Sequence, residues 1–86
     1  MNGYRVLLRP AARRDLDHIP DRICSRVLGK IGRLAANPRP PGSRKLVGGT
    51  DEWRLRAGDY RILYEIDDKT HMVLVFRIRH RREAYR

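Results

Sequence analysis

Between residues 52 and 79 the chain alternates apolar and polar side chains in three short stretches, and this pattern limits the possible folds more than any other feature. Strict alternation is typical of β-strands with one buried face. The stretches are Glu52–Ala57, Tyr60–Ile66 and Met72–Arg79. Gly58-Asp59 and Asp67–Thr70 have the composition of tight turns, so we expect three consecutive antiparallel strands. Their predicted inward side chains are Trp53, Leu55, Ala57, Tyr60, Ile62, Tyr64, Ile66, Met72, Leu74, Phe76 and Ile78.

The first half of the chain predicts one more strand and two helices. Tyr4–Arg9 alternates like a strand, and Pro10, which suits the first turn of a helix, ends it. A short helix runs up to Pro20, a longer one starts at Asp21, and the prolines of residues 37–42 form a loop. The order β-α-α-β-β-β predicts an α+β fold, with a mostly antiparallel four-stranded sheet and two helices packed on one face. We expect a single domain over residues 1–86.

The composition indicates a polyanionic partner. The chain of 86 residues has a formal net charge of +10 and a pI of about 11.0. Of its 20 basic side chains, 17 are arginines, which suit forked phosphate contacts and stacking on bases. Lysine would serve solubility equally well, so the arginines favour nucleic-acid binding over a merely solvated basic surface.

Other functional classes find no support in the sequence. Cys24 is the only cysteine, so no internal disulfide can form and a reducing compartment fits best. No stretch approaches the ~20 apolar residues of a membrane span, and no apolar signal core is present near the start. No Cys/His cluster has metal-ligand spacing. We therefore expect a cytoplasmic protein, away from membranes, with no metal and no cofactor.

Alternation places a group of arginines on the sheet face opposite the apolar side chains. These are Arg54, Arg56, Arg61, Arg77, Arg79 and Arg81. Six like charges on neighbouring strands repel one another unless an anion lies between them. The alternative is a plainly solvated face, but the crowding favours RNA or phosphate binding.

The last residues include groups that suit phosphodiester cleavage, namely His80, Arg81 and Tyr85. Cleavage through the ribose 2′-hydroxyl needs a base, an acid for the departing 5′-oxygen, and cations on the phosphate. An imidazole titrates in the useful range, guanidinium groups stabilise charge, and a phenol can stack on a base or donate a proton. Taken singly, such a histidine is more often structural and such a tyrosine more often fills the core. The prediction therefore depends on the combination.

Four segments together resemble the RelE/ParE toxin superfamily, most closely its RelE branch. They are Tyr4–Leu16, the Asn37-Pro-Arg-Pro loop, the run Trp53–Asp68 and the end His80–Arg86. The resemblance spans almost the whole chain. It implies a metal-independent, ribosome-dependent mRNA endonuclease (an mRNA interferase) acting in the A site and inhibiting translation. It also implies a RelB-like antitoxin that masks the toxin.

The resemblance assigns roles to individual residues. Arg61 corresponds to the family's phosphate-stabilising arginine, and Arg81 to a second arginine that stabilises charge or assists the leaving group. Tyr85 corresponds to the tyrosine that stacks on or orients the substrate. Further contacts to mRNA or ribosomal RNA are expected from Arg44, Lys45, Arg56, Arg77, Arg79 and Arg82.

The general base is where the sequence departs from the RelE pattern. Arg54 stands where the RelE branch has a lysine proposed to help as base, and Glu52 where it has another lysine. Arginine stays protonated and is a poor base. Either His80 takes that role, or catalysis is slower than in the RelE branch.

A second function is compatible with the same fold. A ParE-like toxin would inhibit DNA gyrase by binding, without cutting anything. Because fold does not decide function, the choice depends on the site. The joint presence of Arg61, Arg81 and Tyr85 favours the nuclease, since an inhibitor has no need of them.

Overall fold

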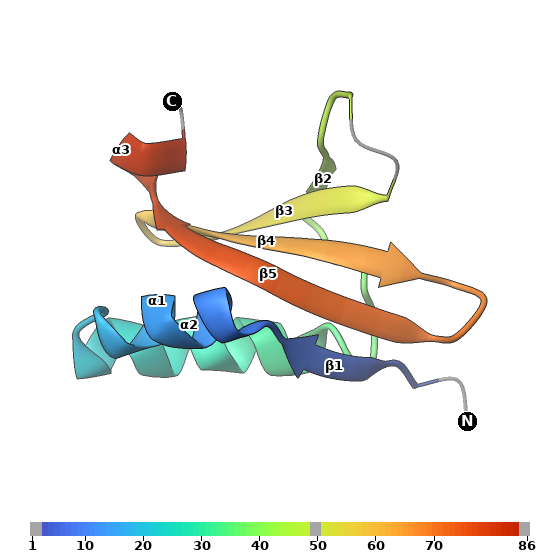
Figure 1. Ribbon diagram of the computed structural model, residues 1–86, viewed down its shortest axis with the longest axis horizontal. Coiled ribbons are helices and arrows are strands. Elements are labelled where there is room, and N and C mark those ends of the chain that lie inside the picture. Colours follow the sequence, from blue (N-terminus) through green and yellow to red (C-terminus); the bar gives the residue numbers. More distant parts are fainter. Residues whose placement is uncertain (1–2, 49–50, 85–86) are drawn as a thin grey trace.

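The computed structural model describes residues 3–48 and 51–84, and its centre is the three-stranded meander that the alternation predicts (Figure 1). Strands β3 (Glu52–Ala57), β4 (Tyr60–Asp67) and β5 (Met72–His80) pair antiparallel in chain order. Gly58 opens the two-residue turn between β3 and β4 with a φ of 62°, which glycine adopts without steric cost. These three strands are confirmed.

The sheet has five strands rather than the predicted four. β1 (Arg5–Leu8) runs parallel to β5 at one edge, and β2 (Arg44–Lys45) pairs antiparallel with β3 at the other. The order is β1-β5-β4-β3-β2. The prediction missed β2 because two residues after a proline-rich loop have no periodicity that could reveal a strand.

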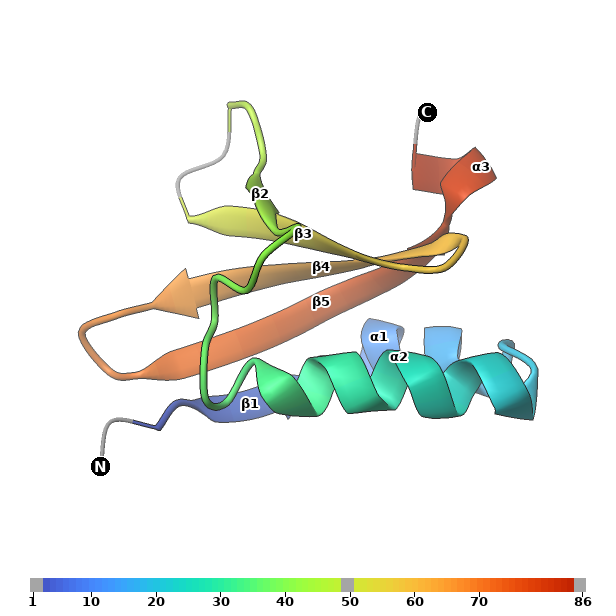
Figure 2. The same cartoon turned by 180° about the vertical axis from the view of Figure 1, so that it is seen from behind.

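Helices α1 (Pro10–Asp17) and α2 (Asp21–Arg33) lie together on one face of the sheet, as predicted (Figures 1 and 2). Pro10 occupies the first turn of α1, where its missing N–H is no loss. A third helix, α3 (Arg81–Ala84), was not predicted. It follows β5 directly and lies on the opposite side of the sheet from α1 and α2 (Figures 1 and 2).

The hydrophobic core lies between the helices and the inner face of the sheet. Its buried members are Ala12, Ile19, Val27, Ile31, Leu34, Leu55, Ala57, Ile62, Tyr64, Ile66, Val73, Val75 and Ile78. The buried Tyr64 hydroxyl donates to the Pro38 carbonyl at 2.8 Å and ties the proline-rich loop to the sheet. Burial raises the pKa of this phenol.

The predicted inward set of β5 is wrong in the first half of the strand. Val73 and Val75 are buried there, whereas Met72, Leu74 and Phe76 are only partly buried. Both faces of this half are apolar, so alternation alone could not tell which face meets the helices.

A β-bulge accounts for the error. The adjacent β4 residues Leu63 and Tyr64 pair with β5 residues two positions apart, which leaves Phe76 as an extra residue. The bulge reverses the alternation, so Ile78 faces the core as predicted and Arg79 faces outward.

Candidate active site

One row of arginines crosses the outer face of the sheet at the end nearest α3. Arg56 pairs with Arg61 across β3 and β4, and Arg61 pairs with Arg79 across β4 and β5. Residues paired in this way have Cβ atoms about 4.5–5.5 Å apart. These three side chains, which we call the arginine row, therefore share one strip of surface, as the alternation predicts.

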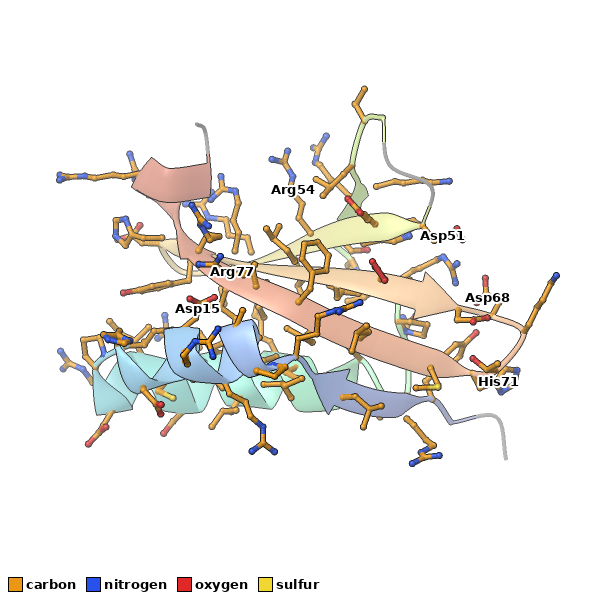
Figure 3. All side chains as sticks on the ribbon, viewed as in Figure 1. Asp15, Asp51, Arg54, Asp68, His71 and Arg77 are labelled. Carbon is orange, nitrogen blue, oxygen red and sulfur yellow. The ribbon has the colours of Figure 1, made fainter. Side chains whose placement is uncertain are left out.

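Two more arginines extend the basic surface toward β2. Arg44 pairs with Arg54, and Arg54 points away from the helices in Figure 3. A hollow of about 140 Å³ is lined by Gly42, Arg44, Arg54, Arg56 and Arg61. The proline-rich loop contributes its backbone to the rim at Gly42, whose φ of 93° favours glycine. A small anion could reach several guanidinium groups in this hollow.

Few carboxylates balance this charge. Among the described residues, no ion pair involves Arg44, Arg54 or Arg79. Within the same residues, the buried Nε of Arg79 lacks a hydrogen-bond partner. A buried donor without an acceptor costs about 1–3 kcal/mol, and like charges on paired strands add repulsion. A phosphate on this face would reduce the repulsion, because guanidinium groups bind phosphate through paired N–H donors.

Arg77 does not join the arginine row, although alternation grouped it there. Its Nε donates to Asp15 Oδ2 at 2.8 Å and its Nη2 to Oδ1 at 3.2 Å, and Figure 3 shows the two side chains meeting between β5 and α1. The same carboxylate accepts the Ile78 N–H at 2.8 Å. Arg77 therefore helps to fix α1 against β5, and the prediction that all six arginines converge does not hold for it.

His80 lies on the inner side of the sheet, opposite the arginine row. It pairs with Tyr60, and the two rings meet edge-on with centroids 5.1 Å apart. With Ile23 and Arg26 of α2 it lines a hollow of about 280 Å³. The sequence held a signal for this placement, since neighbours along a strand face opposite sides and Arg79 faces outward.

Arg81 is the first residue of α3 and lies beside the β3–β4 turn. Its N–H donates to the Asp59 carbonyl at 2.7 Å, and its guanidinium lies 3.7 Å from the Asp59 carboxylate. Arg81 comes two residues after Arg79, so it starts close to that end of the arginine row.

The remaining predicted site residues have different placements. Arg82 is exposed on α3. Lys45 pairs with Trp53, so it lies on the other face of the sheet from Arg54. Tyr85 lies outside the described residues. The structure thus brings together Arg54, Arg56, Arg61, Arg79 and Arg44, while His80, Lys45 and Arg77 lie elsewhere.

Two outer-face carboxylates were missing from the predicted site. Glu52 of β3 pairs with Glu65 of β4, and both side chains are half-buried. Each glutamate is an even number of residues from an arginine on its own strand, Arg54 or Arg61, and therefore lies on the same face. This signal in the sequence could have revealed them. Among the described residues on this face of β3 and β4, they are the groups able to accept a proton that lie nearest to the arginines.

The opposite end of the sheet neutralises its charges internally. Arg39 donates to Asp68 at 3.2 and 2.8 Å, and the Tyr4 hydroxyl donates to the same carboxylate at 2.7 Å. The Arg39 hydrogen bonds, followed by that from Tyr4, lower the pKa of Asp68. The same contacts raise the pKa of Tyr4 and of Arg39, each mainly through its hydrogen bond to Asp68.

The described part of the chain contains no group of three or more His, Cys, Asp or Glu side chains placed to hold a metal ion. None of its helices is long and apolar enough to cross a membrane.

Comparison with known proteins decides the family. A family model described as the ParE toxin of the type II toxin–antitoxin system parDE matches residues 6–85. The chain belongs to the RelE/ParE family of toxins. It is 38% identical over 86 residues to Toxin RelG of Mycobacterium tuberculosis, covering 96% of this chain and 97% of that protein. Toxin RelE of the same organism is 35% identical, with 96% and 87% covered.

The similarity extends to three dimensions. The crystal structure of the toxin–antitoxin complex RelBE2 from M. tuberculosis contains a chain that matches with a TM-score of 0.80, at 34% identity over 91% of each chain. This RelE/ParE-family chain is thus a toxin of a toxin–antitoxin pair, and its α+β fold is that of RelE. The family model has a ParE name and both relatives have Rel names, so the choice between the branches depends on the site.

Proposed function

We propose that this toxin is a ribosome-dependent endonuclease that cleaves mRNA in the ribosomal A site and so inhibits translation. The observation that carries the proposal is the arginine row, with Arg44 and Arg54 beside it around one hollow. Such a surface suits a phosphate backbone, since guanidinium groups hold phosphate oxygens through paired donors. The Rel names of the two M. tuberculosis relatives add support.

The proposed chemistry is an attack by the ribose 2′-oxygen on the neighbouring phosphorus. A bond forms between the 2′-oxygen and phosphorus as the bond to the 5′-oxygen breaks. The 2′-hydroxyl proton passes to a base, and the departing 5′-oxygen takes up a proton. Negative charge grows on the phosphoryl oxygens, and Arg61, flanked by Arg56 and Arg79, is placed to stabilise it.

We assign proton uptake to the Glu52–Glu65 pair rather than to His80. The pair shares the outer face with the arginines, and Glu52 lies two residues, about 7 Å along the strand, from Arg54. Glu52 and Glu65 lie four residues, about 13 Å, from Arg56 and Arg61, so the proton would pass through a bridging water. Glu52→Gln or Glu65→Gln should slow single-turnover cleavage by roughly 10²-fold, since positioned bases contribute about that much. Wild-type rates in both variants would remove the pair from the reaction.

We further propose a RelB-like antitoxin as partner. The M. tuberculosis neighbour is a toxin–antitoxin complex, and the arginine row here would attract an acidic antitoxin segment. Binding should weaken as salt rises, because charge attraction across an exposed face is screened. An affinity independent of salt would contradict docking on the arginine row.

A ParE-like inhibitor of DNA gyrase is the second candidate, favoured by the name of the matching family model. One experiment separates the two. The purified toxin is added to ribosomes programmed with a defined mRNA and, in parallel, to a gyrase supercoiling reaction. The nuclease predicts a primer-extension stop at the A-site codon only when ribosomes are present, with supercoiling unchanged. Inhibited supercoiling with intact mRNA would overturn it.

A further inference from the structure

The chain crosses from the inner to the outer side of the sheet at the junction of β5 and α3, and His80 is the last residue on the inner side. Its Nδ1 accepts the N–H of Arg82, the second residue of α3, at 3.3 Å. The first N–H groups of a helix have no partner inside the helix, and a side-chain acceptor just before the helix can satisfy one. The imidazole thus occupies the position of a helix N-cap.

Packing on the inner side holds the ring in this position. The Tyr60 ring meets it at an angle of 87°, and Ile23 and Arg26 of α2 line the same hollow. On the other side of the junction, the Arg81 N–H donates to the Asp59 carbonyl at 2.7 Å. The first turn of α3 is therefore fixed by hydrogen bonds to two different elements.

We infer that His80 is a positioning residue whose neutral imidazole caps α3 and thereby holds Arg81 beside the arginine row. This inference depends on the proposed nuclease function for its effect on activity. On that function, His80 affects cleavage without touching RNA, since its ring faces the helices.

The cap depends on pH because only a neutral imidazole can accept a hydrogen bond. Protonation occupies the Nδ1 lone pair and adds a positive charge near Arg26 of α2 and near Arg81 and Arg82 of α3. Asp59 is the carboxylate that lines the same hollow, together with the Tyr60 phenol. Protonation of the imidazole should therefore release the first turn of α3.

Two variants separate capping from proton transfer. His80→Asn keeps an uncharged acceptor of a type favoured at N-caps, whereas His80→Leu keeps bulk without an acceptor. At pH 8 we expect the Asn variant to cleave within about 3-fold of wild type and the Leu variant about 10-fold more slowly, the size expected for a lost cap. Between pH 8 and 5.5 the wild-type rate should fall further than the rate of the Asn variant, which has no imidazole to protonate at this position. The matched control is His18→Asn, an exposed position at the end of α1. We expect it to keep the pH–rate profile of the wild type.

A second measurement does not require cleavage. Amide hydrogen exchange of Arg82 is followed by NMR from pH 8 to 5.5. Acidification should reduce its protection in the wild-type protein but not in His80→Asn, which shares the intrinsic pH trend of exchange. An Arg82 amide with the same pH dependence in both proteins would overturn the cap. An Asn variant as slow as the Leu variant would also overturn it and return His80 to proton transfer. A wild-type protein that cleaves no mRNA would overturn the nuclease proposal, while the amide measurement would still decide the cap.

Discussion

At the turn between β4 and β5, Arg39 holds the Asp68 carboxylate through two hydrogen bonds and lies over the Trp53 ring at 5.2 Å from its centroid. At the other end of the sheet, Arg56, Arg61 and Arg79 lie side by side across three strands. The residue type is the same, but the first region supplies its own carboxylate, whereas we propose that the second binds an outside anion. An arginine-rich composition therefore says less about function than the placement of the few carboxylates.

Arg77 shows that neighbouring arginines on one strand can have different surroundings. It lies on the strand that carries Arg79, two residues away, yet Asp15 of α1 binds it through both oxygens. The side chains of Arg77 and Asp15 are 39% and 18% exposed, so this ion pair is partly sheltered from water. We expect Arg77 to stabilise the fold and the arginine row to serve catalysis.

The largest effect should come from the centre of the arginine row. Arg61→Ala should slow ribosome-dependent cleavage by roughly 10²–10³-fold, because it removes a donor from charge that grows in the transition state. Ribosome binding should weaken much less, since the other cations remain. Single-turnover cleavage measures the rate, and Arg22→Ala, an exposed arginine on α2, is the control. A rate within a few-fold of wild type would break the distinction between the two regions.

Removing the carboxylate that pairs with Arg77 should affect stability instead. Asp15→Ala leaves Arg77 and the Ile78 N–H without their acceptor and should cost about 2 kcal/mol of unfolding free energy. Urea denaturation measures it. Asp17→Ala, an exposed change on the same helix, should stay within about 0.5 kcal/mol. Equal losses in the two variants would show that the Asp15 contacts add nothing.

A smaller effect should appear in the salt dependence of RNA binding. Each phosphate contact to a single strand contributes about 0.7 to the slope of log affinity against log salt. Arg56→Ala should lower the slope by about that amount, whereas Arg22→Ala, with the same change in charge, should leave it unchanged. Equal slopes for the two variants would place Arg56 outside the RNA contact.

The smallest effect should be the contribution of the Arg39–Asp68 ion pair to the pH dependence of stability. The hydrogen bonds from Arg39 and Tyr4 lower the pKa of Asp68 in the folded state. A lowered pKa contributes stability above the unfolded value of about 3.9, and this contribution disappears as pH falls through the folded value. Urea denaturation below pH 5 should show a steeper loss for the wild type than for Asp68→Asn. Parallel curves would contradict the proposed role of Asp68.

The arginine row could be predicted from the sequence. Its position follows from the two-residue period of β3 and β4 and from Arg79 facing the outer side of the sheet. It did not predict the bulge at Phe76, since both faces of that half of β5 are apolar. Arg79 was nevertheless placed correctly, because Ile78 beyond the bulge faces the core.

Three site predictions differ from the structure, each for its own reason. The Arg77–Asp15 pair joins residues 62 positions apart, and no local pattern links them. His80 could have been placed by alternation, but its position at the chain's histidine- and arginine-rich end suggested catalysis first. The strand β2, which brings Arg44 to Arg54, has too few residues for a pattern.

NMR of the arginine Nε–H groups tests the central claim most directly. The wild-type protein is titrated with a short single-stranded RNA whose 2′-hydroxyls are replaced by hydrogen, so that it binds without being cut. We predict that the signals of Arg54, Arg56, Arg61 and Arg79 shift while those of Arg39 and Arg77 stay in place. Shifts confined to Arg39 and Arg77, or spread evenly over all six, would contradict the division between the two regions.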